Sequence, residues 1–531
     1  MMDDLTKVAL AGTSRGGQSS LTMSDDLGAE LVGQLESDAE DTLLLRAGVQ
    51  TVCEQAGRLT TSDVPPISPA PVDSRANGSR RLAGLLQNAF ATNSKELLVE
   101  FLRQMQGGGL VLPPDLLPTA LDVSDANLRE QLLPVLGERG VWLSQFRPKW
   151  NWVRTGVASL SGRDRDVLQG EWEHGTIRER CQVLSTIRRA DADEGRTWLE
   201  STFTQEKAEF RARLLGTFEY GLSIDDVEFL ESALDDRSTQ VQSVAAYLLS
   251  QLTESAFANR MQARAEAMLS QTPDADRECG FQLTCEPPEK YDKTWKRDGI
   301  ASKPPTGQGK RAYWAEAVLS AIPPSHWATR FDATPEQLIE AARGGTFDRP
   351  ILKAWTTAAA RFVASDSSSG EWLIPLWNYW ADLADRLKGK GREEAFGQLH
   401  TILPLMTPLQ IEETFLPFLE KTAENQAVEM TGLLGFVPQP WSEKLGRVYL
   451  NVVRRILKSS SRNSSYQWGN TLFTAAKALP REVFEEALAG WEVAATESSG
   501  WHAKAIVKET ERFQDIIRTR QSFYEEVHTT P

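Results

Sequence analysis

The segment at residues 223–252, SIDDVEFLESALDDRSTQVQSVAAYLLSQL, has the pattern of two amphipathic helices joined by a tight turn. Apolar residues recur at helical spacing on each side of the polar break at 235–238, with Leu230 in the first stripe and Leu248 in the second. A single hairpin of this kind cannot bury its apolar stripes alone. The segment therefore predicts that neighbouring hairpins stack against it, with Leu230 and Leu248 in the core.

Both predicted helices begin with capping signals. Ser223, followed three residues later by Asp226, fits a capping box. Ser238 is placed to accept hydrogen bonds from the first free N–H groups of the second helix. The two signals place the turn of the hairpin at the DDRS sequence.

A weak self-similarity with an offset of 31 residues extends from residue 176 to residue 270. Apolar positions recur in columns across three units, which favours a HEAT-like α-solenoid of stacked hairpins over a closed helical bundle. HEAT units usually carry an Arg after the first Val of the second helix, whereas Gln242 follows Val241 here, which weakens the case for a charged ladder along the turns. The columns are Leu184, Leu215 and Ala246; Ile187, Phe218 and Leu249; Leu199, Leu230 and Met261; and Phe203, Leu234 and Ala265.

The bulk composition is that of an ordinary soluble protein, since 41% of the 531 residues are hydrophobic and 25% are charged. A formal net charge of −15 argues against a broad nucleic-acid surface, because phosphate binding needs a positive footprint. The cysteines form no CxxC pair and have no His at zinc spacing, so we expect reduced thiols in a cytoplasmic protein. No window approaches about 18 uninterrupted apolar residues, so no membrane span is expected.

Changes in composition divide the chain into five segments. Residues 1–61 form an N-terminal helical segment, and residues 62–80 form a Pro/Ser-rich linker whose clustered prolines exclude a helix. HEAT-like helical repeats follow over 81–270. An irregular connector rich in Pro, Gly and charge occupies 271–310, and its FQLTC run is strand-like. A C-terminal helical region covers 311–531.

The stretch at 295–314 is the candidate partner-binding surface. It interrupts the helical period with a turn, two prolines and two glycines, and it combines cations with aromatic residues, a mixture that protein interfaces favour. The alternative is a structural loop that only bridges two helical halves. The candidate residues are Trp295, Arg297, Asp298, Lys303, Arg311 and Trp314.

Two motifs have the letters of a catalytic or cofactor site but lack its context. GTSRG at 12–16 matches a nucleophile elbow, but the few residues before it cannot supply the sheet that an elbow needs. GQGKRA at 307–312 resembles a dinucleotide fingerprint, but two prolines stand where the preceding strand must be. Its glycines and cations at a helix start could still hold an anion. The five His residues lie far apart, so we expect no metal, no cofactor and no catalytic residue.

Several short motifs stand in chain order along the sequence. They are LAGTSR at 10–15, LGERG at 136–140 with WL at 142–143, FLE at 229–231 with DDRS at 235–238, RDGI at 297–300, KPPTG at 303–307 and RAYW at 311–314. Together these motifs resemble a bacterial family of unknown function, numbered 5691 among such domains. The likeness covers most of the chain, and no residue of that family has an assigned role that could be carried over. The resemblance implies a bacterial helical-repeat protein, often encoded beside MoxR-type AAA ATPases, von Willebrand A-domain proteins and SWIM zinc-finger proteins.

Together these observations predict an all-α, HEAT-like α-solenoid that acts as a non-enzymatic adaptor or scaffold for protein partners. The 16 Trp residues and the repeats suit an extended protein-binding surface. The resemblance implies that the partner is a MoxR-type AAA ATPase or a von Willebrand A-domain protein. One alternative is an enzyme whose site is assembled by the 295–314 loop. Another is a nucleic-acid-binding solenoid that uses the basic helix at 447–462, for which a solvated face is the simpler interpretation.

Overall fold

The computed structural model describes residues 39–55, 67–91, 94–161, 165–422, 427–458, 462–491 and 501–529. The chain divides into two compact units, Met1–Pro69 and Ala70–Pro531. In the first unit the described helix is α3 (Ala39–Gln55). The GTSRG motif at 12–16 and the 62–66 part of the expected linker lie outside the described residues.

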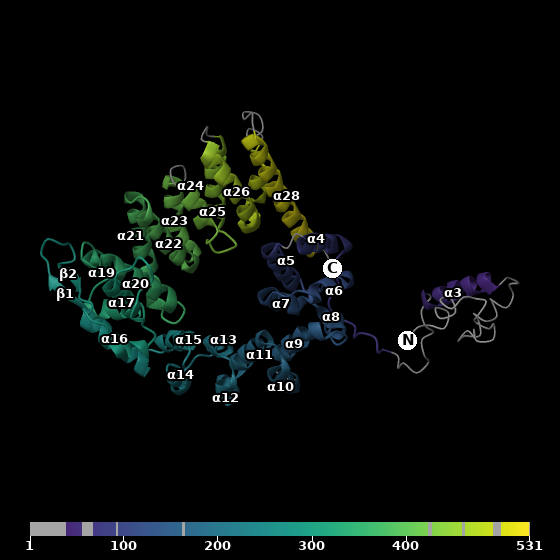
Figure 1. The fold of residues 1–531 in the computed structure, drawn as a ribbon. Helices are drawn as coiled ribbons and strands as arrows, with labels where there is room; N and C mark the ends of the chain where they lie inside the picture. The colour runs from purple at the N-terminus through teal and green to yellow at the C-terminus, as the bar shows by residue number, and fades with distance from the viewer. Residues whose placement is uncertain are drawn as a thin grey trace. The chain divides into compact units, whose positions relative to one another are not determined.

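The second unit is built from α-helices joined by short turns (Figure 1). The residues just before α4 (Arg80–Ala91), the first helix of this unit, are hydrogen-bonded to the rest of the unit. The Gly78 N–H donates to the carbonyl oxygen of Val111 at 3.1 Å. The helices up to the connector are α4 (Arg80–Ala91), α5 (Lys95–Gly107), α6 (Leu117–Leu121), α7 (Ala126–Leu132), α8 (Gly137–Ser144), α9 (Asn151–Ser161), α10 (Arg165–His174), α11 (Ile177–Ala190), α12 (Ala192–Thr202), α13 (Ala208–Gly216), α14 (Val227–Ala233), α15 (Thr239–Ser250) and α16 (Ala256–Met268).

The predicted repeat is confirmed by the order of the helices, in which α11 and α12, α13 and α14, and α15 and α16 follow one another as three units. The hairpin predicted at 223–252 is also confirmed, because α14 packs on α15. The first helices of the three units stack in one layer, because α11 packs on α13 and α13 packs on α15 (Figure 1). Every member of the apolar columns is buried except Ala246, which is partly buried. The fold is therefore the all-α, HEAT-like stack of helical hairpins that the sequence predicts.

The two helix starts of the central hairpin differ in how they are capped. The predicted capping box at Ser223 is confirmed: its hydroxyl accepts from the Asp225 N–H at 3.3 Å, and its own N–H donates to the Asp226 carboxylate at 3.1 Å. The prediction for Ser238 is wrong, because its hydroxyl accepts no capping bond. Instead, the Asp236 carboxylate accepts from the Ser238 backbone N–H at 2.7 Å and closes the turn.

A charged ladder does run along the turns, and it changes character at Gln242. Arg180 pairs with Glu206 at 2.5 Å, and Arg211 pairs with Asp236 at 2.8 Å. Arg211 also donates to the carbonyl oxygen of Glu206 at 2.6 Å. One repeat later, the Gln242 amide donates to the carbonyl oxygen of Asp236 at 2.7 Å. Gln242 thus keeps the backbone contact but carries no charge. Its presence after Val241 counted against a charged ladder, whereas Arg180 and Arg211 in the two preceding repeats do form charged pairs along the turns.

We expect Leu230→Ala and Leu248→Ala each to lower the free energy of unfolding by about 2–5 kcal/mol, because each deletes buried methyl groups and leaves a cavity. Both side chains are buried in the core of the repeats. Urea unfolding followed by circular dichroism measures the change. Gln240→Ala on the exposed side of α15 is the control and is expected to change stability by less than about 0.5 kcal/mol. Leucine variants that match this control would contradict the packing of the hairpin.

The connector contains a short β-hairpin. Strands β1 (Leu269–Pro273) and β2 (Phe281–Cys285) pair antiparallel, with Leu269 opposite Cys285. The strand-like FQLTC run is β2, whereas β1 lacks any apolar alternation and was not predicted. The short 3-10 helix η8 (Lys293–Lys296) follows before the helices resume.

Helices continue to the end of the described chain. In the parts of the chain that are described, no helix is both long enough and apolar enough to cross a membrane. The helices after the connector are α17 (Lys310–Leu319), α18 (Pro324–Phe331), α19 (Pro335–Ala342), α20 (Asp348–Phe362), α21 (Leu373–Arg386), α22 (Lys390–Ile402), α23 (Pro408–Thr422), α24 (Ala427–Leu434), α25 (Glu443–Lys458), α26 (Arg462–Ala478), α27 (Phe484–Leu488) and α28 (Trp501–Thr529).

The last helix of the second unit packs against its first helices. α28 contacts both α4 and α5 (Figure 1), and Phe523 stacks on Phe101 with ring centroids 3.8 Å apart. Arg520 forms an ion pair with Glu100, 420 residues away in the sequence, at 2.6 Å. The two ends of the helical array are therefore joined, through an interface that we call the end seam.

Candidate functional site

The two tryptophans of the predicted partner-binding loop lie in the core. Trp295 is 5% exposed and Trp314 is 2% exposed, and their rings meet edge to face with centroids 6.1 Å apart. Tyr291 packs against both rings, and the Trp314 indole N–H donates to the carbonyl oxygen of Ala301 at 3.2 Å. These aromatic residues hold the connector onto the helical array.

Arg297 ties the loop to α14. Its guanidinium lies 2.8 Å from the Asp235 carboxylate and 3.0 Å from that of Glu231. The hydrogen bond to Asp235 is the main reason why the pKa of Arg297 is raised, and the same bond lowers the pKa of Asp235. The charge of Arg297 is thus matched by groups of its own chain.

Asp298 is buried beneath two guanidinium groups. Arg260 lies 2.8 Å and Arg264 2.7 Å from its carboxylate, and Arg260 also reaches Glu231. The chain then turns at Gly299, whose φ of 79° a residue with a side chain rarely adopts. Because Glu231 faces both Arg260 and the loop, one ion-pair network joins the connector to α14 and α16.

Arg311 and Lys303 differ in their surroundings. Arg311 donates twice to the carbonyl oxygen of Pro287, at 2.7 and 2.9 Å, and its guanidinium lies 5.4 Å from the ring centre of Phe347. Lys303 is exposed, and no described side chain pairs with it. A partner-binding role for the six loop residues stays a prediction, and Lys303 is the member best placed for it.

Two cations of the basic helix α25, Arg447 and Arg454, are engaged within the protein. Arg447 pairs with Glu443 at 2.5 Å and with Glu486 at 2.8 Å. Arg454 donates to the backbone carbonyl oxygens of Glu486 and Ala489, the latter at 2.7 Å. These contacts leave less positive charge for phosphate, which weakens the nucleic-acid alternative.

The abundance of tryptophan suggested an extended protein-binding surface, but most of these side chains are buried. Among the Trp side chains that the structure describes, Trp142 and Trp198 are partly buried and the others are buried. Several are among the largest fully buried side chains of the protein, such as Trp327 and Trp355. Their main contribution is to the area and shape of the core.

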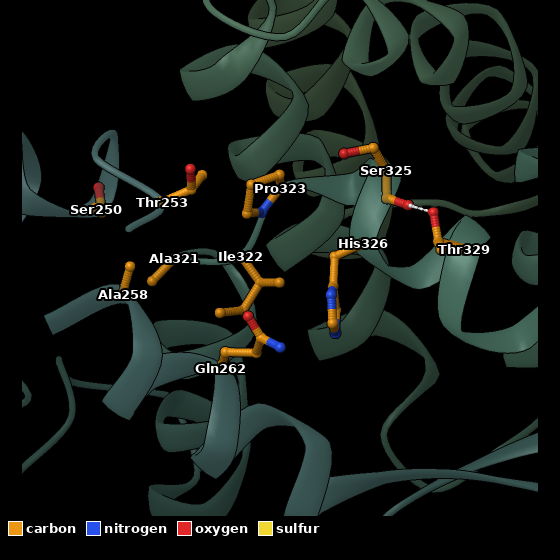
Figure 2. Close-up of a pocket in the computed structure, with 10 residues that line it drawn as sticks. All are labelled: Ser250, Thr253, Ala258, Gln262, Ala321, Ile322, Pro323, Ser325, His326 and Thr329. Atoms are coloured by element: carbon orange, nitrogen blue, oxygen red, sulfur yellow. Dashed lines mark hydrogen bonds between the residues drawn. The ribbon is translucent and has the colours of Figure 1, made fainter. Parts of the chain in front are cut away.

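A cavity of about 290 Å³ opens where α15, α16 and α18 meet (Figure 2). Part of its wall is apolar and comes from Ala258 of α16 and from Ala321, Ile322 and Pro323, just before α18. The other lining residues carry polar groups without a fixed charge. They are Ser250, Thr253, Gln262, Ser325, His326 and Thr329.

Glu266 holds the amide and the imidazole of this cavity in place. Gln262 Nε2 donates to Glu266 Oε1 at 2.9 Å, and His326 Nε2 lies 3.1 Å from the same oxygen. Arg330 lies 3.2 Å from the other oxygen. In Figure 2 the side chains of Gln262 and His326 extend toward each other from neighbouring helices.

The hydroxyl groups of α18 are also bonded locally. Thr329 Oγ1 donates to the backbone carbonyl oxygen of Ser325 at 3.1 Å (Figure 2). At the α15 end, the Ser250 hydroxyl donates to the carbonyl oxygen of Tyr247 at 2.6 Å and accepts from Arg361 at 3.2 Å. The cavity therefore offers fixed hydrogen-bonding groups rather than a reactive pair.

We expect the stability of the protein to fall as the pH drops below about 6.5, in part because of His326. Burial lowers the pKa of His326, and the carboxylate of Glu266 offsets only part of this effect. The folded protein therefore binds this proton more weakly than the unfolded chain. The contribution of neutral His326 is complete above the unfolded pKa and declines below it.

Urea unfolding at about pH 7.5 and pH 5.5 measures this effect. His326→Gln should lose less stability between the two pH values than the unchanged protein. His174→Gln is the matched control, because the His174 side chain is 84% exposed. Equal pH dependence in all three proteins would contradict the assignment.

Cysteine and metal chemistry have little support within the described residues. No group of three or more His, Cys, Asp and Glu side chains that could hold a metal ion occurs there. Cys181 and Cys279 are partly buried free thiols. Burial raises the pKa of the Cys285 thiol to about 12, so this buried group stays protonated and unreactive near neutral pH.

Sequence reasoning did not find the cavity. Its lining residues come from separate helices and a turn, and no motif or spacing links Gln262 to His326. A double proline at 323–324 marks the start of α18, but such a signal indicates only a helix boundary. The pairing of α16 with α18 depends on how the connector folds.

The stacked helical pairs and their shared core define an all-α repeat protein of the HEAT-like α-solenoid class. The chain belongs to a family of unknown function (DUF5691), whose sequence profile matches residues 4–527. The resemblance seen in the sequence motifs is thereby confirmed. No curated protein gives a significant match.

Two solved structures show weak likeness to this chain. An engineered protein from the Northeast Structural Genomics Consortium matches with a TM-score of 0.24 and 14% identity, over 76% of this chain and 98% of its own. A mutant of Kap121p matches with a TM-score of 0.26 and 12% identity, over 99% of this chain and 48% of its own. At these scores neither likeness carries an argument about fold or function.

Proposed function

We propose that this protein is a non-enzymatic adaptor that binds a protein partner along its stacked helices. The observation that supports this proposal best is the cavity between α15, α16 and α18, which mixes an apolar wall with uncharged hydrogen-bonding groups. Such a mixture is common in surfaces that recognise proteins. General acid–base catalysis instead needs a group free to exchange a proton, whereas Glu266 is already engaged by Gln262, His326 and Arg330.

An aromatic residue beside the cavity fits the same role. Tyr247 lies one turn before Ser250 on α15, and it is 45% exposed. Half-exposed tyrosines contribute strongly to protein interfaces, because they bury a large ring and keep a polar tip. Together with the cavity, Tyr247 gives α15 an exposed surface next to a recess.

The expected partner is a MoxR-type AAA ATPase or a von Willebrand A-domain protein, as the family resemblance implies. The test is affinity purification of the tagged full-length chain from its source organism, followed by native mass spectrometry. The adaptor proposal expects a stoichiometric complex with a second protein. Gln262→Leu combined with His326→Phe should weaken the complex several-fold, while Gln240→Ala should leave it unchanged.

Two outcomes would overturn the adaptor proposal. One is the absence of any stoichiometric partner under conditions in which the tagged chain is folded and abundant. The other is turnover of a small molecule by the purified chain that Lys303→Ala or Arg311→Glu abolishes, since this would favour the enzyme alternative at the 295–314 loop.

We also expect no tight binding to duplex DNA. The chain carries a net charge of −15, and Arg447 and Arg454 are engaged within the protein. A fluorescence titration at about 0.15 M salt should show no submicromolar affinity. Submicromolar binding that weakens steeply with added salt would instead support the alternative of a nucleic-acid-binding solenoid.

A further inference from the structure

Arg361 is a mostly buried cation that no described carboxylate neutralises. It lies in the last turn of α20, where its Nη1 donates to the Ser250 hydroxyl at 3.2 Å. Its guanidinium carbon lies 5.4 Å from the ring centre of Tyr247. Within the described chain, Ser250 is its hydrogen-bonding partner, and no ion pair is formed.

Other buried arginines of this unit are matched by acids. Arg188 pairs with Asp226 at 2.7 Å, and Arg520 pairs with Glu100 at 2.6 Å. Leaving a cation desolvated without an opposite charge reduces stability, because burial penalises the charged form. The same cause lowers the pKa of Arg361, which nevertheless remains charged at neutral pH. An uncompensated charge of this kind suggests that a ligand completes the site.

The position of Arg361 connects it to the cavity. Ser250 lines the cavity and fixes one end of the guanidinium, while its own proton is donated to the carbonyl oxygen of Tyr247. Tyr247 is exposed on the same turn of α15. Arg361 and Tyr247 are therefore both joined through Ser250 to a recess lined by uncharged groups.

We propose that Arg361 and Tyr247 bind a carboxylate of an acidic side chain on the protein partner, while an uncharged neighbouring residue of that partner occupies the cavity. This inference rests on the proposed adaptor function and names the chemistry of its partner. A guanidinium matches a carboxylate through two parallel hydrogen bonds.

The local charge favours a carboxylate over a phosphate group. Arg361 supplies a single positive charge, and the nearby Arg330 is already paired with Glu266 at 3.2 Å. A phosphorylated side chain carries nearly two negative charges and is usually bound by several cations. Gln262 and the cavity hydroxyls add hydrogen bonds but no charge.

The first test measures stability. Arg361→Gln should leave the melting temperature unchanged or raise it, because it removes a desolvated charge that has no partner. Arg361→Lys, which keeps the charge, is the conservative variant. A marked drop in melting temperature for Arg361→Gln would show a structural role and overturn the proposal.

The second test uses an array of peptides of about nine residues, with uncharged flanks and a central Glu, Gln, Lys or phosphoserine. The full-length chain should bind the Glu series about tenfold better than the Gln series. Arg361→Gln should abolish this preference, and Arg361→Lys should retain part of it. Arg386→Gln removes a charge that is 61% exposed and paired with Asp382, so it should keep the preference.

Equal binding of the Glu and Gln series by the unchanged chain would overturn the proposal, as would a preference that survives in Arg361→Gln. Stronger binding of phosphoserine than of Glu would also overturn it, in favour of a phosphate site. Affinity purification of the tagged chain tests the adaptor function separately, because it detects whether any protein partner is bound. If no variant captures a protein, the adaptor proposal fails, whatever the peptides show about Arg361.

Discussion

Asp226→Ala is expected to lower the free energy of unfolding by about 3–5 kcal/mol, which makes it one of the most damaging single changes in the repeats. Asp226 and Arg188 are both fully buried, and their side chains are 2.7 Å apart. Arg196 lies 3.1 Å from the same carboxylate. Removing Asp226 leaves the Arg188 cation in the core without an opposite charge, and this unpaired charge accounts for most of the expected loss.

The contacts of Arg188 explain why this loss spreads across the array. Its guanidinium donates to the backbone carbonyl oxygens of Ala192, Tyr220 and Gly221, at 3.0, 2.9 and 3.0 Å. The Arg188 side chain therefore joins α11 to the start of α12 and to the turn before α14. A guanidinium that is displaced from Asp226 would strain all of these backbone contacts.

Urea unfolding measures the effect. Asp193→Ala is the control, because Asp193 also pairs with Arg196 but is 68% exposed, and exposed pairs contribute at most about 1 kcal/mol. Replacing both members of the buried pair, as Arg188→Met with Asp226→Leu, should recover much of the lost stability. If Asp226→Ala cost no more than Asp193→Ala, the buried pair would not be a structural element.

Arg520→Met is expected to open the end seam, with a local loss of about 3–5 kcal/mol. Arg520 is 2% exposed and donates to the Glu100 carboxylate through Nε at 2.8 Å and Nη2 at 2.6 Å. Its Nη1 donates to the carbonyl oxygen of Ala476 at 2.7 Å, and the Tyr524 hydroxyl donates to Glu100 at 2.7 Å. The change removes a cation that α5, α26 and α28 share, and it leaves Glu100 without its counter-charge.

Hydrogen exchange measured by mass spectrometry tests this prediction. Amide protection should fall in α4, α5 and α28 of the Arg520→Met protein, while α13 and α15 should keep theirs. Arg81→Ala is the control, because the Arg81 side chain pairs with Glu526 but is 64% exposed. Unchanged protection in α4 and α5 would mean that the seam does not hold the two ends of the array together.

Local features of the central hairpin could be predicted because they depend on neighbours in sequence. The period of apolar residues identified Leu230 and Leu248 as core positions, and the offset between units predicted columns that are buried in the fold. The capping box at Ser223 was found for the same reason, since its bonds span three residues. Ser238 was misassigned because two acceptors compete for nearby donors, and only the turn geometry favours Asp236.

The surroundings of the loop at 295–314 could not be predicted from neighbouring residues in the sequence. An aromatic residue beside cations has the composition of an interface, but burial of Trp295 and Trp314 depends on the helices that cover them. From the sequence, the charged groups of Arg297 and Asp298 were candidates for contacts with a protein partner. Their partners on α14 and α16 lie between 34 and 66 residues away and become neighbours only when the repeats stack.

The sequence by itself determined the fold class, the repeat unit and the core columns, because helical periodicity is a local property that each pair expresses in the same way. The tertiary structure decided the end seam, the cavity and the unmatched Arg361. The seam depends on contacts of α28 with α4 and α5, which lie far from it in the sequence and are linked to it by no local pattern. The cavity depends on how the connector returns the chain beside α16, and whether a buried cation is neutralised depends on which side chains that packing brings within hydrogen-bonding distance.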